Sequence, residues 1–144
     1  MRRKSGEKSE QESIDYLNPS NLDGILISHS HKDHFFGLSF VNRSIPIYTG
    51  VVTKKIIEAF YKAAKPAIDN NFAGLNWKPF RTGEILDIKG LKIVPFHVDH
   101  SIPAAYGFII YTSVGPMIYT GDFRMHGPLS VSYTHLTLPT TPYV

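Results

Sequence analysis

The chain has 144 residues, of which 42% are hydrophobic and 19% are charged, and this composition is typical of one soluble globular domain. Fifteen basic and twelve acidic residues leave a net charge of only +3, which is too small to indicate a polyanionic partner by itself. The absence of cysteine excludes disulfides and thiolate metal sites, and no apolar run approaches the roughly 20 residues that span a bilayer. The N-terminus also lacks the apolar segment of a secretory signal, so we expect a cytoplasmic protein with no membrane partner.

The first part of the chain predicts a polar lead-in followed by two short strands. Residues 1–19 are polar and irregular, and we expect them to be poorly ordered. Residues 23–28 form a short apolar run that is typical of a buried strand. A second short strand is expected at 45–48, where Pro46 favours either a strand start or a sheet edge.

Residues 51–65 predict an amphipathic helix. Val52, Ile56 and Phe60 recur at helical spacing and form the expected apolar face, while lysines and a glutamate occupy the opposite face. The helix is expected to end before Pro66, because a proline disfavours the helical conformation of the residue that precedes it.

The second half of the chain predicts two β-hairpins. Residues 84–88 and 91–96 flank a Lys-Gly dipeptide, which is typical of a tight turn. Residues 105–111 and 116–119 flank a second turn in the same way. A first half with strands and a helix, followed by a strand-rich half, predicts an α/β (α+β) fold.

Four side chains that bind metals occupy six consecutive positions after the first predicted strand: His29, His31, Asp33 and His34. Imidazole nitrogen and carboxylate oxygen are ligands that zinc accepts at about 2.0–2.2 Å. Successive side chains point in different directions, so the cluster cannot easily surround one ion tetrahedrally. It can serve two neighbouring ions that take further ligands from elsewhere in the chain. The cluster therefore predicts half of a two-metal hydrolytic site.

Two further candidate ligands follow strands of the second half. His100 comes after the strand at 91–98, and Asp122 comes after the strand at 117–119. Loops at strand ends commonly carry functional side chains. Taken singly, each residue is as compatible with a hydrogen-bonded turn as with metal ligation. Together with the first cluster, they favour ligation.

Neighbouring residues have less specific interpretations. We expect His97 to pack against or support the site rather than to bind metal. Asp99 is expected to be a solvated loop acid, and Arg124 a surface residue that would meet a phosphate only in the less favoured alternative. Core packing rather than base stacking is expected for Phe72, Trp77 and Phe80.

Three motifs together resemble those of the metallo-β-lactamase fold. They are His-x-His-x-Asp-His at 29–34, His-Ser-Ile-Pro at 100–103 and Thr-Gly-Asp-Phe at 120–123. The last two are most similar to the β-CASP branch, especially ribonuclease J-like nucleases. The resemblance covers residues 20–129, which we expect to form a partial αββα sandwich. It implies two zinc ions and hydrolysis of RNA phosphodiester bonds.

The resemblance also implies a role for each candidate ligand. The first zinc would be held by His29, His31 and His100. The second would be held by Asp33 and His34, with the Asp122 carboxylate bridging both ions. Asp33, His34 and Asp122 are the residues expected to act in catalysis. Metal ions lower the pKa of bound water from about 15.7 to about 7, so a hydroxide between two zinc ions is available near neutral pH.

The sequence departs from the family pattern in several places. Phe36 stands where a glycine is usual, two positions after the last histidine of the first motif. The β-CASP insertion and the later histidine motifs, which the family places after Asp122, are absent from the sequence, so we expect a truncated fragment of a larger enzyme. Residues 130–144 resemble the translation of a sequencing-library adapter and are expected to be a non-native tail.

Three functions from different classes remain open at this point. The first is a zinc-dependent, ribonuclease J-like hydrolase of RNA that is present only in part. The second is a hydrolase with the same fold and metals that acts on a small ester, thioester or lactone. The third is a metal-binding fragment without activity. Manganese also suits a histidine and carboxylate site, and oligomerisation of the full-length enzyme stays open.

Overall fold

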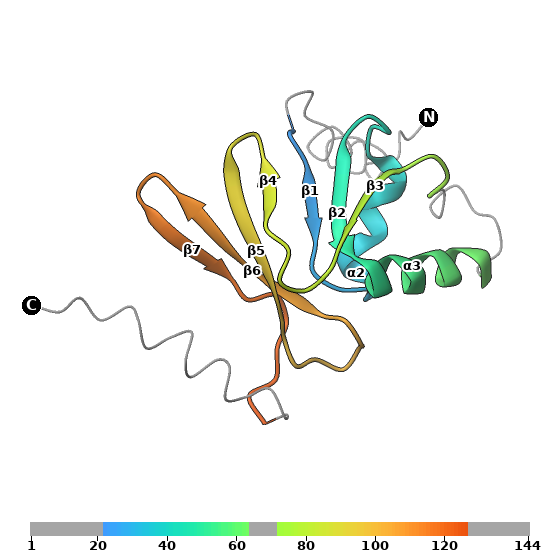
Figure 1. Cartoon of the computed structure of the whole chain (residues 1–144). Coiled ribbons are helices and arrows are strands. Elements are labelled where there is room, and N and C mark those ends of the chain that lie inside the picture. The colour runs from blue at the N-terminus through green and yellow to red at the C-terminus, as the bar shows by residue number, and fades with distance from the viewer. Residues whose placement is uncertain (1–21, 64–71, 127–144) are drawn as a thin grey trace, which may run out of the picture.

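The computed structural model describes residues 22–63 and 72–126, which form the helices and strands shown in Figure 1. The expectations for residues 1–19 and for residues 130–144 lie outside the described residues. The elements in chain order are β1 (Ile25–Ile27), α2 (Lys32–Phe35), the 3-10 helix η1 (Phe36–Phe40), β2 (Pro46–Gly50), α3 (Val51–Ala63), β3 (Asn76–Phe80), β4 (Leu86–Ile88), β5 (Leu91–His97), β6 (Tyr106–Thr112) and β7 (Gly115–Tyr119).

The strands β1, β2 and β3 form a three-stranded parallel sheet with β2 in the centre. Because successive side chains of a strand point to opposite faces, a continuous apolar run covers both faces of the sheet. Ile27 and Ile47 pack with the helices on one face, whereas Leu26 and Tyr48 pack toward the second sheet. The two strands expected in this part of the chain are confirmed, and Pro46 is the first residue of β2.

The helix α3 packs on this sheet, but through a different face from the expected one. Thr53 and Ile57 are fully buried, whereas Val52 and Phe60 are 49% and 42% exposed. The predicted apolar face is therefore wrong. The buried face includes a polar residue, and its hydroxyl donates a hydrogen bond of 2.7 Å to a backbone carbonyl, so Thr53 can be buried without an unsatisfied donor. Residues 64 and 65, the last of the predicted helix, lie outside the described part.

The strands β4 to β7 form a four-stranded antiparallel sheet in the order β4-β5-β6-β7. Both predicted hairpins are confirmed. The turn between β4 and β5 is formed by Lys89 and Gly90, whose φ angles of 54° and 86° are those of a hairpin turn that matches the strand twist. Phe80, Ile93 and Phe108 form a buried cluster between the two sheets.

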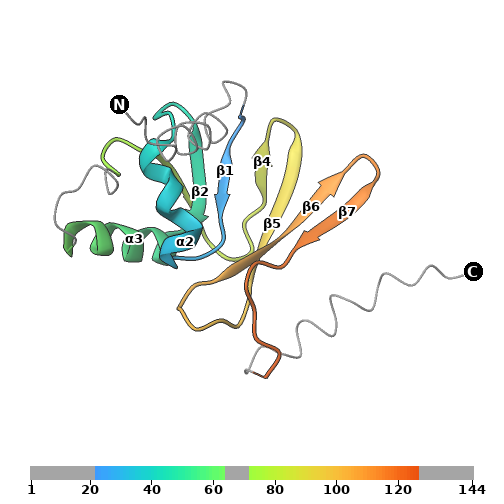
Figure 2. The same ribbon diagram turned by 180° about the vertical axis from the view of Figure 1, so that it is seen from behind.

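Three layers result: the helices, the three-stranded sheet and the four-stranded sheet (Figure 1, and Figure 2 from behind). This mixed α/β arrangement confirms the expected partial sandwich. The carboxyl ends of β1, β5 and β7 point toward the same end of the molecule in Figure 1. None of the helices in the described residues has the length and apolar character that crossing a bilayer requires.

Candidate metal centre

Three segments of the chain at one end of the molecule carry the candidate ligands. The chain leaves β1 and passes through His29 to His31, which occupies the N-cap position of α2, and His34 lies within that helix. His100 lies in the loop after β5, and Asp122 lies in the loop after β7. The fold therefore brings together side chains that are up to 93 positions apart in the sequence, from 29 to 122.

The first group consists of nitrogen atoms from three imidazoles. The Nε2 atom of His29 lies 3.1 Å from the Nδ1 atom of His31, which in turn lies 3.0 Å from the Nε2 atom of His100. Two ligands bound tetrahedrally to one zinc at about 2.0–2.1 Å are about 3.3–3.4 Å apart. The observed separations are close to that value, so the three imidazoles fit a single small divalent cation.

The second group adds a carboxylate. The Oδ2 atom of Asp122 lies 3.4 Å from Nε2 of His34 and 3.9 Å from Nε2 of His29. It also lies 3.8 Å from Nε2 of His100, which belongs to the first group. In each group, His29-His31-His100 and His29-His34-Asp122, the ligand atoms lie within 4.8 Å of one another, so each could hold a metal ion. The Asp122 carboxylate thus belongs to the second group and also lies beside the first.

Asp33 lies at the edge of the cluster. Its side chain is 83% exposed, and its Oδ2 atom is 3.7 Å from Nε2 of His34. It belongs to neither of the two groups. Adjacent residues of a helix diverge by about 100° around the axis, so Asp33 and His34 of α2 cannot point the same way. A role for Asp33 as a ligand of the second ion remains a prediction.

Burial keeps the central imidazoles neutral. His29 is fully buried, and this burial, together with the charges of the neighbouring imidazoles, lowers its pKa from 6.5 to about 4. Burial and the neighbouring His31 also lower the pKa of His100. A neutral imidazole is the form that binds a metal ion. The hydroxyl of Ser28 lies 3.0 Å from Nδ1 of His29, on the side opposite the Nε2 atom that faces the cluster, and so helps to hold the ring in place.

Asp99 and Arg124 lie beside the cluster and are paired. The prediction that Asp99 is a solvated acid is wrong, because its side chain is only 10% exposed and its Oδ1 atom accepts a hydrogen bond of 3.2 Å from the Arg124 guanidinium. Arg124 is half-exposed, which agrees with the predicted surface position. Its guanidinium nevertheless binds a carboxylate of the protein itself. The two residues are 25 positions apart, so no periodic pattern in the sequence indicates the pair.

The predictions that His97, Phe72, Trp77 and Phe80 serve in packing are confirmed. His97 stacks on Tyr106 with a centroid separation of 4.4 Å, and its Nε2 atom lies 2.7 Å from the hydroxyl of Thr82 rather than in the cluster. Phe72 and Phe80 are buried in the two main apolar clusters, at 7% and 1% exposure. Trp77 packs against the first of these clusters.

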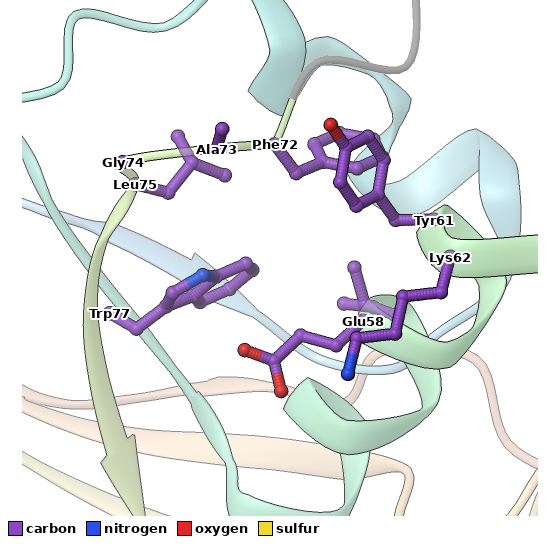
Figure 3. Close-up of a pocket in the computed structure, with 9 residues that line it drawn as sticks. Glu58, Tyr61, Lys62, Phe72, Ala73, Gly74, Leu75 and Trp77 are labelled. Carbon is purple, nitrogen blue, oxygen red and sulfur yellow. The ribbon is translucent and has the colours of Figure 1, made fainter. Parts of the chain in front are cut away.

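A pocket of about 330 Å³ lies between α3 and β3, apart from the candidate metal centre (Figure 3). The rings of Tyr61, Phe72 and Trp77 surround it, and Glu58 and Lys62 of α3 supply its charged groups. None of the candidate metal ligands is among its lining residues. The lining of the pocket is therefore mainly apolar, in contrast to the imidazole and carboxylate cluster.

Comparison with known proteins identifies the class of this protein. The sequence model of the beta-lactamase superfamily domain matches residues 6–131. The chain therefore belongs to the metallo-β-lactamase superfamily, as the three motifs predict, and is of a hydrolase family whose fold implies the use of divalent metal ions.

Among curated relatives, the chain is similar to ribonucleases J. It is 32% identical over 127 residues to ribonuclease J 1 of Streptococcus pyogenes, covering 77% of this chain and 21% of that protein. It is 27% identical over 117 residues to ribonuclease J of Sinorhizobium meliloti, covering 76% of this chain and 20% of that protein. The chain spans about a fifth of the length of these relatives.

Solved structures show the same fold at lower identity. A protein of unknown function from Enterococcus faecalis matches with a TM-score of 0.66 and 21% identity, over 78% of this chain and 28% of that one. The metallo-beta-lactamase fold protein YhfI from Bacillus subtilis matches with a TM-score of 0.57 and 18% identity, over 78% of this chain and 46% of that one. These likenesses establish the fold of the described layers.

Proposed function

We propose that the chain is part of a ribonuclease J-like enzyme of the β-CASP branch that uses two zinc ions to cleave RNA phosphodiester bonds in the cytoplasm. The observation that carries the proposal is the convergence of four imidazoles and the Asp122 carboxylate from three separate segments of the chain, with separations of 3.0–3.9 Å between neighbouring ligand atoms. The similarity to ribonucleases J supports RNA as the substrate.

The donor set supports zinc as the metal. Hard cations such as Mg²⁺ and Ca²⁺ prefer oxygen ligands, whereas imidazole suits zinc. His29, His31 and His100 would hold one ion. His34 and Asp33 would hold the other, and Asp122 would bridge both, since the two oxygens of one carboxylate can address two cations. Manganese is the alternative metal, because it also accepts imidazole and carboxylate.

The chemistry follows from what these side chains provide. Bound metal ions would lower the pKa of a bound water to about 7 and polarise the phosphate oxygens. The protein supplies neutral imidazoles, because burial opposes protonation of His29 and His100. It also supplies the carboxylates of Asp33 and Asp122, whose side chains are 83% and 48% exposed and so can be reached from solution. We assign this function to residues 20–129.

The test is cleavage of an end-labelled RNA oligonucleotide by the purified chain in zinc, with and without a chelator. We expect cleavage that the chelator abolishes and that Asp122→Asn reduces about 100-fold or more, because the substitution keeps the size of the side chain but removes the charge that would help to hold both ions. Asp23→Asn is the matched control, since this exposed aspartate lies beside Lys89 at 3.6 Å and away from the cluster.

Other outcomes would point to the other functions. Metal-dependent hydrolysis of a chromogenic thioester or lactone, without cleavage of RNA, would indicate a small-molecule hydrolase. Binding of zinc with no cleavage of either substrate would contradict the proposal and identify a metal-binding chain without activity.

A further inference from the structure

Arg124 connects two of the loops that carry candidate ligands. Its guanidinium Nη2 donates a hydrogen bond of 2.8 Å to the backbone carbonyl of His100 and one of 3.2 Å to Oδ1 of Asp99. Its backbone N–H donates a further bond of 2.7 Å to the backbone carbonyl of Asp99. Arg124 lies two positions after Asp122. Three hydrogen bonds therefore join the loop after β5 to the loop after β7.

These contacts pair the charge of the Asp99 carboxylate and also restrict the orientation of the two loops. The carboxylate of Asp99 is nearly buried, at 10% side-chain exposure, and a buried carboxylate needs a well-placed cationic donor. The Arg124 guanidinium is planar and rigid, so binding a carboxylate and a carbonyl together restricts how the two loops can lie. The carbonyl that it binds belongs to His100 itself.

The far end of the same loop is held by other elements. The buried hydroxyl of Thr53 in α3 donates a hydrogen bond of 2.7 Å to the carbonyl of Ala104, which has a positive φ of 57°. The N–H of Tyr106 donates one of 2.9 Å to the carbonyl of Ser28, the residue before His29. The end of the loop is thus fixed to α3 and to the first ligand loop, and Arg124 fixes its beginning to the loop of Asp122.

We propose that Arg124 is a positioning residue that holds His100 and Asp122 in the arrangement required by a metal ion before the ion binds. The inference rests on the proposed metal centre. Two loops that had to become ordered on binding would lower the metal affinity, so contacts that order them in advance raise it. Partners that orient metal ligands in this way typically contribute 10- to 100-fold to affinity.

The test measures the zinc affinity of the whole chain by competition with a chromophoric chelator. Arg124→Met keeps the aliphatic stem but removes the guanidinium, and we expect its dissociation constant for zinc to rise about tenfold or more. We expect Arg124→Lys to recover part of this loss, because an ammonium can donate to either acceptor but lacks the planar geometry of the guanidinium.

Arg43→Met is the matched control. The Arg43 guanidinium also binds backbone carbonyls, those of Leu38, Ser39 and Val41, but none of these belongs to a candidate ligand. If Arg124 only stabilised the fold, the two variants would lower the melting temperature alike and leave zinc affinity unchanged. A positioning role predicts weaker zinc binding in Arg124→Met alone, and faster hydrogen exchange at residues 98–105 of the metal-free variant.

The outcomes separate this inference from the proposed function. Wild-type zinc affinity in a folded Arg124→Met chain would overturn the positioning role and leave the metal centre intact. A wild-type chain that bound no zinc would overturn both. If Arg124→Met does not fold, Arg124→Lys and Asp99→Asn take its place, and unchanged zinc affinity in both would overturn the inference.

Discussion

The helix–sheet core and His29, at the centre of the histidine cluster, are buried to the same degree, but burial has a different physical effect in the two places. Ile47 and Ile57 in the core and His29 in the cluster all have 0% exposed surface. Burial of an aliphatic side chain contributes roughly 1.5–3 kcal/mol to stability. Burial of His29 instead opposes protonation and lowers its pKa to about 4. Apolar burial therefore stabilises the fold mainly between its layers, whereas burial at the ends of the strands keeps a metal-binding imidazole neutral.

The largest expected effect tests the core. Ile57→Ala should lower the free energy of unfolding by about 2–5 kcal/mol, because it leaves a cavity between α3 and the sheet. The zinc affinity of the folded chain should not change, since Ile57 belongs to neither ligand group. Urea denaturation and chelator competition measure the two quantities.

Val52→Ala on the same helix is the control for that prediction. Val52 is 49% exposed, so its truncation should cost no more than about 0.5 kcal/mol. Equal costs for the two substitutions would contradict the observed orientation of α3. A large loss of zinc affinity in Ile57→Ala would show that the helix–sheet core and the histidine cluster are energetically coupled.

A smaller effect, on pH dependence, tests the cluster. In the metal-free chain, His29 takes up a proton near pH 6.5 when unfolded but only near pH 4 when folded. The unfolded state therefore binds more protons between these values, and stability should fall as the pH falls from 6.5 toward 4, by up to about 1.4 kcal/mol per pH unit. Denaturation midpoints across this range measure the loss.

His29→Asn provides the comparison for the pH prediction. The variant lacks the titrating group and should lose stability less steeply over the same range. Identical slopes in the two proteins would show that the burial of His29 does not govern the acid sensitivity. Substitution of the core, as in Ile57→Ala, should shift the whole profile and leave its slope unchanged.

The smallest expected effect lies on the exposed side of α3. Lys54 and Glu58 form an i, i+4 ion pair of 2.6 Å. Because such pairs are hydrated and screened by salt, a double-mutant cycle with Lys54→Ala and Glu58→Ala should give a coupling of about 0.3–0.5 kcal/mol. The coupling should decrease in high salt. A coupling several times larger would place part of the stability outside the buried core.

The elements that the sequence pattern predicts are those with strong local signals. Both hairpins have turn residues between apolar runs, and the first strand is an apolar run that ends at the cluster. The sequence pattern does not predict β3, because Lys78 and Pro79 interrupt its apolar residues. Its extended conformation depends on pairing with β2, and Pro79 is tolerated because β3 lies at the edge of the described sheet.

The candidate metal centre shows the same division between features with local sequence signals and features that depend on long-range contacts. Residue type and local context indicate all six candidate ligands, because each is a histidine or an aspartate whose side chain can bind a metal ion. Nothing local indicated that Asp99 pairs with Arg124 or that Asp33 points toward solvent. These features depend on how the loops pack against one another.

The sequence alone therefore determined the class of this protein, its hairpins and the candidate metal ligands, because each of these follows from residue type and short-range order. The tertiary structure decided which face of α3 is buried, that His29 belongs to both ligand groups, and that Arg124 reaches His100. Each of these depends on contacts between segments distant in the chain. Such contacts are set by the packing of the layers, and no local pattern encodes them.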